Sequence, residues 1–93
     1  MKEEIIFSCL EKHKGIEITA VTDGVLWGYR FSITNNKAGI GYPPSDISFE
    51  TKDKAIVKAC VIVKDKLKKF DNVFGTKKFY KFYEDQTQLN IFK

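Results

Sequence analysis

The sequence predicts a single small α+β domain: a short N-terminal helix, a three-stranded antiparallel sheet, a long amphipathic helix packed across it and an aromatic-rich C-terminal segment. Three observations lead to this class. Residues 16 to 33 alternate apolar and polar side chains on either side of an Asp-Gly pair, as β-hairpins do. Residues 51 to 70 repeat apolar side chains at helical spacing. The length of 93 residues leaves room for only one core.

The first predicted element is a short amphipathic helix over residues 3 to 13, followed by Gly15, where a left-handed cap would end it. The run Ile5-Ile6-Phe7 is also a good opening for a strand, because β-branched and aromatic residues favour strands, and local propensity leaves both interpretations open. The side chains at helical spacing are Ile5, Ile6, Cys9, Leu10 and His13.

Three strands are expected next, joined as a meander. Residues 16 to 22 alternate until Asp23-Gly24, which is a turn signal, and residues 25 to 33 form the returning strand. A polar, glycine-containing stretch at 35 to 39 then supplies residues that tolerate positive φ. Residues 40 to 42 complete the sheet as a short third strand.

The strongest periodicity in the chain predicts a long helix that begins at Thr51, a good N-cap, with Asp53 in the first turn where its charge favours the helix dipole. Val57 and Val61 fall on the opposite, lysine-bearing side, so we expect another segment to cover them. The apolar face of this helix consists of Ile56, Ala59, Cys60, Val63, Leu67 and Phe70.

Residues 74 to 83 carry five aromatic side chains and are the expected cover, either as a short helix capped by Thr76 or as a strand. The folded body is predicted to end at Glu84, which gives one domain over residues 1–84. Residues 85 to 88 are polar and are interpreted as a spacer, so that residues 85–93 form a C-terminal tail.

The tail ends in Gln88-Leu89-Asn90-Ile91-Phe92, which resembles the peptide by which bacterial replication and repair proteins dock on the DNA sliding clamp. The resemblance implies that Gln88, Leu89, Ile91 and Phe92 bind the clamp, with the apolar side chains in one pocket and the Gln88 amide held by hydrogen bonds. The competing interpretation is that Leu89 and Ile91 alternate in an ordinary terminal strand of the sheet.

Charge is distributed unevenly along the chain. Residues 51 to 81 hold ten lysines and three aspartates, a balance of +7, whereas the formal net charge is +4, so the remainder carries −3. Such a basic half is typical of nucleic-acid contact, although lysines also commonly solvate a helix face. Arg30 is the sole arginine, so any contact would be electrostatic and poorly selective. The candidate nucleic-acid-binding residues are Lys54, Lys58, Lys68, Lys69, Lys77, Lys78 and Lys81.

The predicted order of helix, three strands and helix loosely resembles that of the double-stranded RNA-binding domain, and Thr51-Lys52-Asp53-Lys54-Ala55 is similar to the lysine-bearing helix start of that family. Asp53 stands where the family has the second residue of an adjacent lysine pair. Three strands followed by a helix also occur in integrase-type DNA-binding domains and small antitoxin domains, so this order is an analogy.

Other classes are disfavoured. The chain has no glycine-rich phosphate loop and no spaced nucleophile, base and acid set, so we expect no enzyme, cofactor, metal or small-molecule substrate. Cys9 and Cys60 are interpreted as buried free thiols; on a helix Cys9 would share a face with His13, the minimum geometry for a metal pair or activated thiol. No apolar run could cross a membrane and no signal peptide is evident, so a cytoplasmic location is expected.

These observations lead to two hypotheses of different class. In the first, the chain is a small accessory protein of DNA replication, repair or a mobile element, which docks on the sliding clamp through its tail and contacts nucleic acid through its lysines. In the second, it is a protein-binding or inhibitor module whose basic half meets an acidic partner, and the tail is structural.

Overall fold

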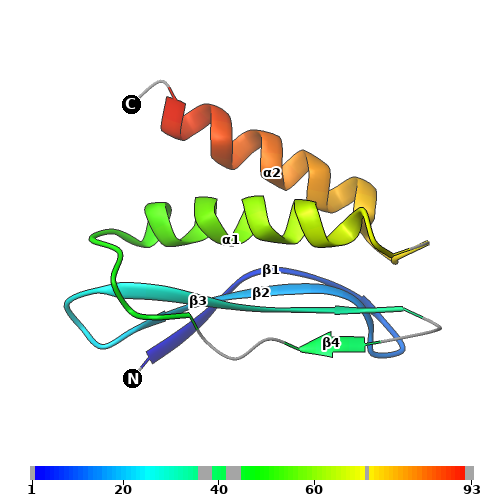
Figure 1. Ribbon diagram of the computed structural model, residues 1–93, viewed down its shortest axis with the longest axis horizontal. Coiled ribbons are helices and arrows are strands. Elements are labelled where there is room, and N and C mark those ends of the chain that lie inside the picture. Colours follow the sequence, from blue (N-terminus) through cyan, green and yellow to red (C-terminus); the bar gives the residue numbers. More distant parts are fainter. Residues whose placement is uncertain (1, 36–38, 42–44, 71, 92–93) are drawn as a thin grey trace.

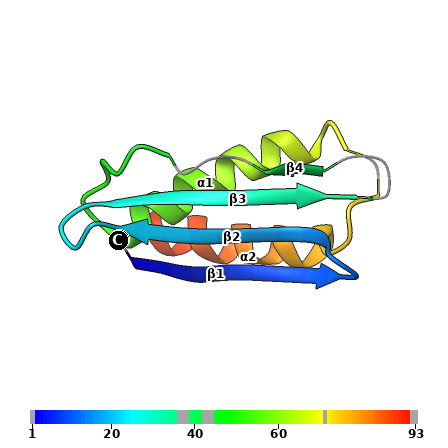
Figure 2. The same cartoon turned by 90° about the horizontal axis from the view of Figure 1, so that it is seen from below.

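The computed structural model describes the backbone of residues 2–35, 39–41, 45–70 and 72–91 as two layers, a sheet with two helices on one of its faces (Figure 1). The sheet is an antiparallel meander of four strands in the order β1-β2-β3-β4. Seen from the open face of the sheet, α1 lies behind β3 and β4, and α2 lies behind β1 and β2 (Figure 2). The elements are β1 (Lys2–Glu11), β2 (Lys14–Thr22), β3 (Trp27–Thr34), β4 (Gly39–Gly41), α1 (Lys52–Leu67) and α2 (Thr76–Ile91).

The N-terminal helix predicted for residues 3 to 13 is wrong, because this segment is the edge strand β1. It forms a hairpin with β2 in which Glu11 pairs with Lys14 across a two-residue loop. Lys12 and His13 both adopt positive φ, 52° and 66°, as the central residues of a type I′ turn must. The order of elements therefore differs from that of the double-stranded RNA-binding domain, which begins with a helix.

A β-bulge explains why β1 does not show the usual strand pattern in the sequence. The register with β2 shifts between Ile5 and Phe7, so one extra residue interrupts the alternation of inward and outward side chains. Ile5 is 62% exposed, whereas Phe7 packs against the core. This interruption produced the apparent helical spacing of the apolar residues.

The predicted central hairpin is confirmed. Ile16 pairs with Ile33 and Ile18 with Phe31, and these four side chains face the helices. The turn begins at Asp23, whose carboxylate accepts hydrogen bonds of 2.8 Å each from the backbone N–H groups of the two residues before β3, Val25 and Leu26. These hydrogen bonds, that from Leu26 first, hold the pKa of Asp23 below its ordinary value.

The edge of β3 that faces away from β2 is paired by two separate segments. β4 pairs with its end, at the position of the third predicted strand, although Tyr42, the expected last residue of that strand, lies outside the described residues. Residues 45 to 49 then pair with its beginning: the N–H of Trp27 donates to the carbonyl of Phe49 at 2.8 Å, and the N–H of Ser45 donates to that of Tyr29 at 2.8 Å. Together they leave little of this edge free to pair.

The long helix agrees with its prediction as α1. Thr51 is its N-cap, and its hydroxyl accepts a hydrogen bond from the N–H of Lys54 at 3.2 Å. Asp53 lies in the first turn. The buried face packs mainly on β3 and forms the core with the inner face of the sheet; it consists of Ala55, Ile56, Ala59, Cys60, Val63 and Leu67.

The aromatic segment is a helix, and it is longer than expected. α2 starts at Thr76 and buries Phe79 completely, with the Phe79 ring meeting that of Phe7 edge-on at 5.9 Å and 76°. The helix continues past Glu84 to Ile91, so the described part of the expected spacer and tail, residues 85 to 91, is helical rather than extended or a terminal strand. The far end of α2 rises away from the sheet (Figure 1).

The described part of the connector between the helices, residues 68–70 and 72–75, is fixed against β1 at one glycine. Gly75 has φ +87°, and a Cβ there would lie 2.7 Å from the sulfur of Cys9. Gly24, in the β2–β3 turn, also has positive φ, +101°, but an added Cβ there would meet nothing within 4 Å. A side chain at either glycine would strain the backbone, but only at Gly75 would it also clash with neighbouring atoms.

This contrast predicts the cost of placing a methyl group at each position. Gly24→Ala should lower the free energy of unfolding by about 1 kcal/mol through backbone strain alone. Gly75→Ala should lower it by about 3 kcal/mol, because the strain is joined by a clash with a buried side chain. Urea titration of both variants measures the difference, and equal losses would contradict the described packing of the connector on Cys9.

Candidate nucleic-acid interface

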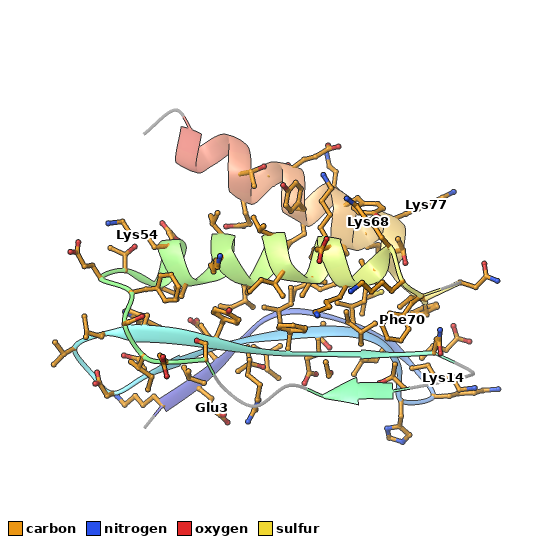
Figure 3. All side chains as sticks on the ribbon, in the orientation of Figure 1. Glu3, Lys14, Lys54, Lys68, Phe70 and Lys77 are labelled. Atoms are coloured by element: carbon orange, nitrogen blue, oxygen red, sulfur yellow. The ribbon has the colours of Figure 1, made fainter. Side chains whose placement is uncertain are left out.

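The fold gathers exposed lysines from three separate segments at one end of the molecule, which we call the basic end. The segments are the β1–β2 turn, the end of α1 and the start of α2. Figure 3 shows Lys14, Lys68 and Lys77 at this end, and Glu3 and Lys54 at the other. The basic end consists of Lys12, Lys14, Lys68, Lys69, Lys77 and Lys78, all of them exposed.

The position of the connector brings the three segments together. Gly75 packs on Cys9 near the end of β1, and β1 leads directly into the turn that carries Lys12 and Lys14. Val73 is buried in the core on the same connector, and the hydroxyl of Thr76 donates to its carbonyl at 2.7 Å. The connector is thus anchored on both sides of Phe74, and the lysines before and after it lie at the same end of the molecule as the turn (Figure 3).

Helix polarity reinforces the positive potential at this end. The positive pole of α2, its N-terminus, begins there, and its first turn carries no acidic side chain but includes Lys77 and Lys78. The C-terminus of α1, which is its negative pole, lies nearby, and the positive charges of Lys64 and Lys66 in its last turn offset that pole. Close like charges raise the local potential, which attracts anions over distances comparable to the Debye length.

A polar pocket of about 360 Å³ opens at the basic end between the β1–β2 turn and the connector. Its aromatic wall is Phe74, which is 41% exposed. Among the described residues, one carboxylate, that of Glu11, belongs to the lining. The pocket is lined by Glu11, Lys12, Lys14, Asn35, Asn72 and Phe74.

The opposite end of the molecule holds cations in ion pairs. Arg30 lies 2.8 Å from Glu3 on the open face of the sheet, and Lys52 lies 2.8 Å from Glu4 beside the start of α1. The Glu4 hydrogen bond and charge raise the pKa of Lys52. Because these pairs are exposed, they add little stability, but they reduce the net positive field at this end.

The lysines selected from the sequence therefore separate into two groups. Lys68, Lys69, Lys77 and Lys78 come together at the basic end, and Lys81 lies exposed on the next turn of α2. Lys54 lies at the start of α1, at the other end (Figure 3), and Lys58 lies one turn further along this helix. Lys54 approaches the carboxylate of Glu50 at 3.4 Å, one helical turn before it.

Sequence reasoning missed Lys12 and Lys14, together with the pocket residues Asn35 and Asn72. Their segments are far apart in the chain, and Lys12 was assigned to a helix rather than to a turn. The available signal was the sequence Glu11-Lys12-His13-Lys14 between two apolar stretches, which is compatible with a tight hairpin turn once residues 3 to 11 are read as a strand.

The lysine-bearing side of α1 also carries Val57 and Val61. α2 covers this side in part: the ammonium of Lys64, one turn after Val61, lies 4.5 Å from the ring centre of Tyr83. Val61 is still 44% exposed. Val57 and Val61 form a shallow groove of about 420 Å³ with the stems of Lys54 and Lys58.

The residues of the clamp-like peptide lie at the far end of α2. Gln88, Leu89, Asn90 and Ile91 have helical backbone, and Phe92 lies outside the described residues. The chain in this form is not the extended peptide that the sequence resemblance implies. Docking in the extended form would require the last helical turn to unwind.

Cys9 and Cys60 are buried free thiols, as expected. Cys9 lies in β1 and His13 in the following turn, so the two do not share a helix face. Within the described residues, no three metal-binding side chains of His, Cys, Asp or Glu form a group that could hold a metal ion.

Searches of the chain against protein-family models, curated proteins and solved structures gave no match. Within the described part of the chain, neither helix has the length and apolar character needed to cross a membrane.

Burial of Cys60 generates a prediction about its reactivity. Loss of solvation raises the pKa of this thiol to about 12. At pH 8 the thiolate fraction is then roughly one in 10⁴, so alkylation by iodoacetamide in the folded protein should be negligible over hours and complete in denaturant. Mass spectrometry of the Cys60 peptide measures both. Rapid labelling of the native protein would contradict the burial of this side chain in the core.

Proposed function

We propose that this chain is a small non-enzymatic accessory protein that binds the phosphate backbone of nucleic acid through its basic end. The observation that carries the proposal is the convergence of exposed lysines from three chain segments at one end of the molecule (Figure 3). Phosphate neutralisation by lysines supplies most of the affinity of non-selective nucleic-acid binding.

The composition of the basic end also favours binding to the phosphate backbone over selective recognition of the base sequence. Selective recognition of base edges commonly uses the bidentate guanidinium of arginine. Arg30 is the chain's sole arginine and is paired with Glu3 at the other end of the molecule. Lysine ammonium groups act as point charges, which suit phosphates of any sequence.

The lysine positions predict a salt-dependent experiment with a matched control. Lys68→Gln/Lys77→Gln should weaken binding to a fluorescent oligonucleotide about tenfold at low salt, and should reduce the slope of log K against log salt by about two. Lys54→Gln/Lys58→Gln removes the same charge from α1 at the other end and should change both quantities little. Fluorescence anisotropy at several salt concentrations measures them.

Two results would contradict this proposal. Equal losses in the two double variants would mean that only net charge matters and that no defined interface exists. An absence of salt-dependent binding to single- or double-stranded DNA or RNA would mean that the lysines do not bind nucleic acid. They would then only keep the surface solvated, or they would bind an acidic protein partner, which is the alternative function.

The C-terminal peptide supports a second, compatible proposal, that the chain docks on the bacterial sliding clamp through Gln88, Leu89, Ile91 and Phe92. The sequence match carries it. Figure 1 adds that the end of α2 lies away from the sheet, where unwinding of one turn would not open the core. Tethering to a clamp would raise the local concentration of a weak, non-selective binder at replication sites.

Clamp docking is tested by separating the motif from the helix. Leu89→Ala/Phe92→Ala should abolish binding to purified clamp in surface plasmon resonance. Thr87→Pro places a proline just before the motif and destabilises the helix there by about 3 kcal/mol. This variant should bind at least as tightly as the original chain, because the extended form of the motif becomes more populated. Loss of binding in Thr87→Pro, or equal binding of the alanine variant and the original chain, would refute extended docking.

A further inference from the structure

We propose that the pocket at the basic end receives one unpaired nucleotide, with its base stacked on Phe74 and its phosphate beside Lys12 and Lys14, so that the protein prefers single-stranded nucleic acid. This inference rests on the proposed function and goes further, because it assigns the form of nucleic acid and the subsite. The pocket joins the chemistry that a nucleotide requires, an aromatic face, amides and ammonium groups, on three chain segments.

Phe74 has the properties of a stacking platform. Its side chain is 41% exposed, although both neighbouring positions are fixed: Val73 is 7% exposed in the core, and Gly75 packs on Cys9. The carbonyl of Gly75 also accepts a hydrogen bond from the N–H of Phe79 at 2.9 Å. A ring held on an anchored connector loses little freedom when a base stacks on it, and every base offers a π-face.

The polar lining groups match the other parts of a nucleotide. Lys12 and Lys14 carry the charge that a phosphate needs. Asn35 and Asn72 carry amides, which both donate to and accept from base edges. Glu11 is the one carboxylate among the described lining residues; it repels phosphate and therefore favours placement of the base, whose exocyclic amino group can donate to it, on its side of the pocket.

Backbone conformation indicates that this pocket is costly to build. Lys12, His13 and Asn72 all have positive φ, at 52°, 66° and 54°, and two of the three line the pocket. Left-handed backbone costs about 1–2 kcal/mol for a lysine or histidine, and less for an asparagine such as Asn72. Strain of this kind concentrates at binding sites, where a side chain is needed at a position that glycine would occupy more easily.

The size of the pocket limits what can enter. A volume of about 360 Å³ is at the lower end of the range for small-ligand sites, which suits one nucleotide rather than several. In a duplex the face of each internal base is covered by its neighbours, so stacking on Phe74 requires an unpaired base or a strand end. The lysines around the pocket bind phosphates of either form, and Phe74 adds affinity for the single strand alone.

The test compares two aromatic side chains of similar exposure. Phe74→Leu should weaken binding of a fluorescent single-stranded oligonucleotide of mixed base sequence about tenfold, the loss expected for one stacked base, and leave binding of the matched duplex unchanged. Tyr80, on α2, is 37% exposed and does not line the pocket, so Tyr80→Leu should change neither affinity. Phe74→Trp should retain the single-strand preference, because the larger ring still stacks.

The outcomes separate this inference from the function on which it rests. If the original chain shows salt-dependent binding and Phe74→Leu binds single strand and duplex as the original chain does, the pocket inference fails. The proposal that the basic end binds the phosphate backbone then remains. Equal losses in Phe74→Leu and Tyr80→Leu also overturn it. If the original chain binds no nucleic acid, both proposals fail. Circular dichroism of each variant verifies that the fold is retained.

Discussion

The contact between Phe79 and Phe7 is the constraint on which the arrangement of this domain depends. Phe79 is completely buried in the first full turn of α2, and its ring meets Phe7 on β1 edge-on. Phe82 adds a second ring at 5.1 Å from Phe7. Removing a buried aromatic ring typically costs about 3–5 kcal/mol, which is comparable to the whole stability of many small domains. The same contact fixes the start of α2, and with it the connector, against the first hairpin.

Separation of charge follows from this packing rather than from the order of residues in the chain. The helices run back and forth across the sheet, so the end of α1, the start of α2 and the first hairpin turn meet at one end. Carboxylates gather at the other, where Glu3, Glu4 and Glu50 are paired with cations. Such a dipolar molecule is turned by the field of a polyanion before contact, so its basic end arrives first.

Sequence patterns predicted the elements whose periodicity is simple and failed where one residue disrupts it. The face of α1 and its cap at Thr51 follow from regular spacing, and the central hairpin follows from alternation around Asp23. β1 was mistaken for a helix because its bulge near Ile5 breaks a period of two. The basic half of the chain could be predicted from composition, but the contributions of Lys12 and Asn72 could not, because only the fold brings their segments together.

The left-handed turn at Lys12 and His13 implies a trade-off between stability and chemistry. An Asn-Gly pair adopts this turn with less strain, so exchanging the two residues for Asn and Gly would make the hairpin more stable by about 1 kcal/mol or more. The same exchange would remove an ammonium group from the rim of the pocket. Lys12 therefore places positive charge at the pocket at the expense of hairpin stability.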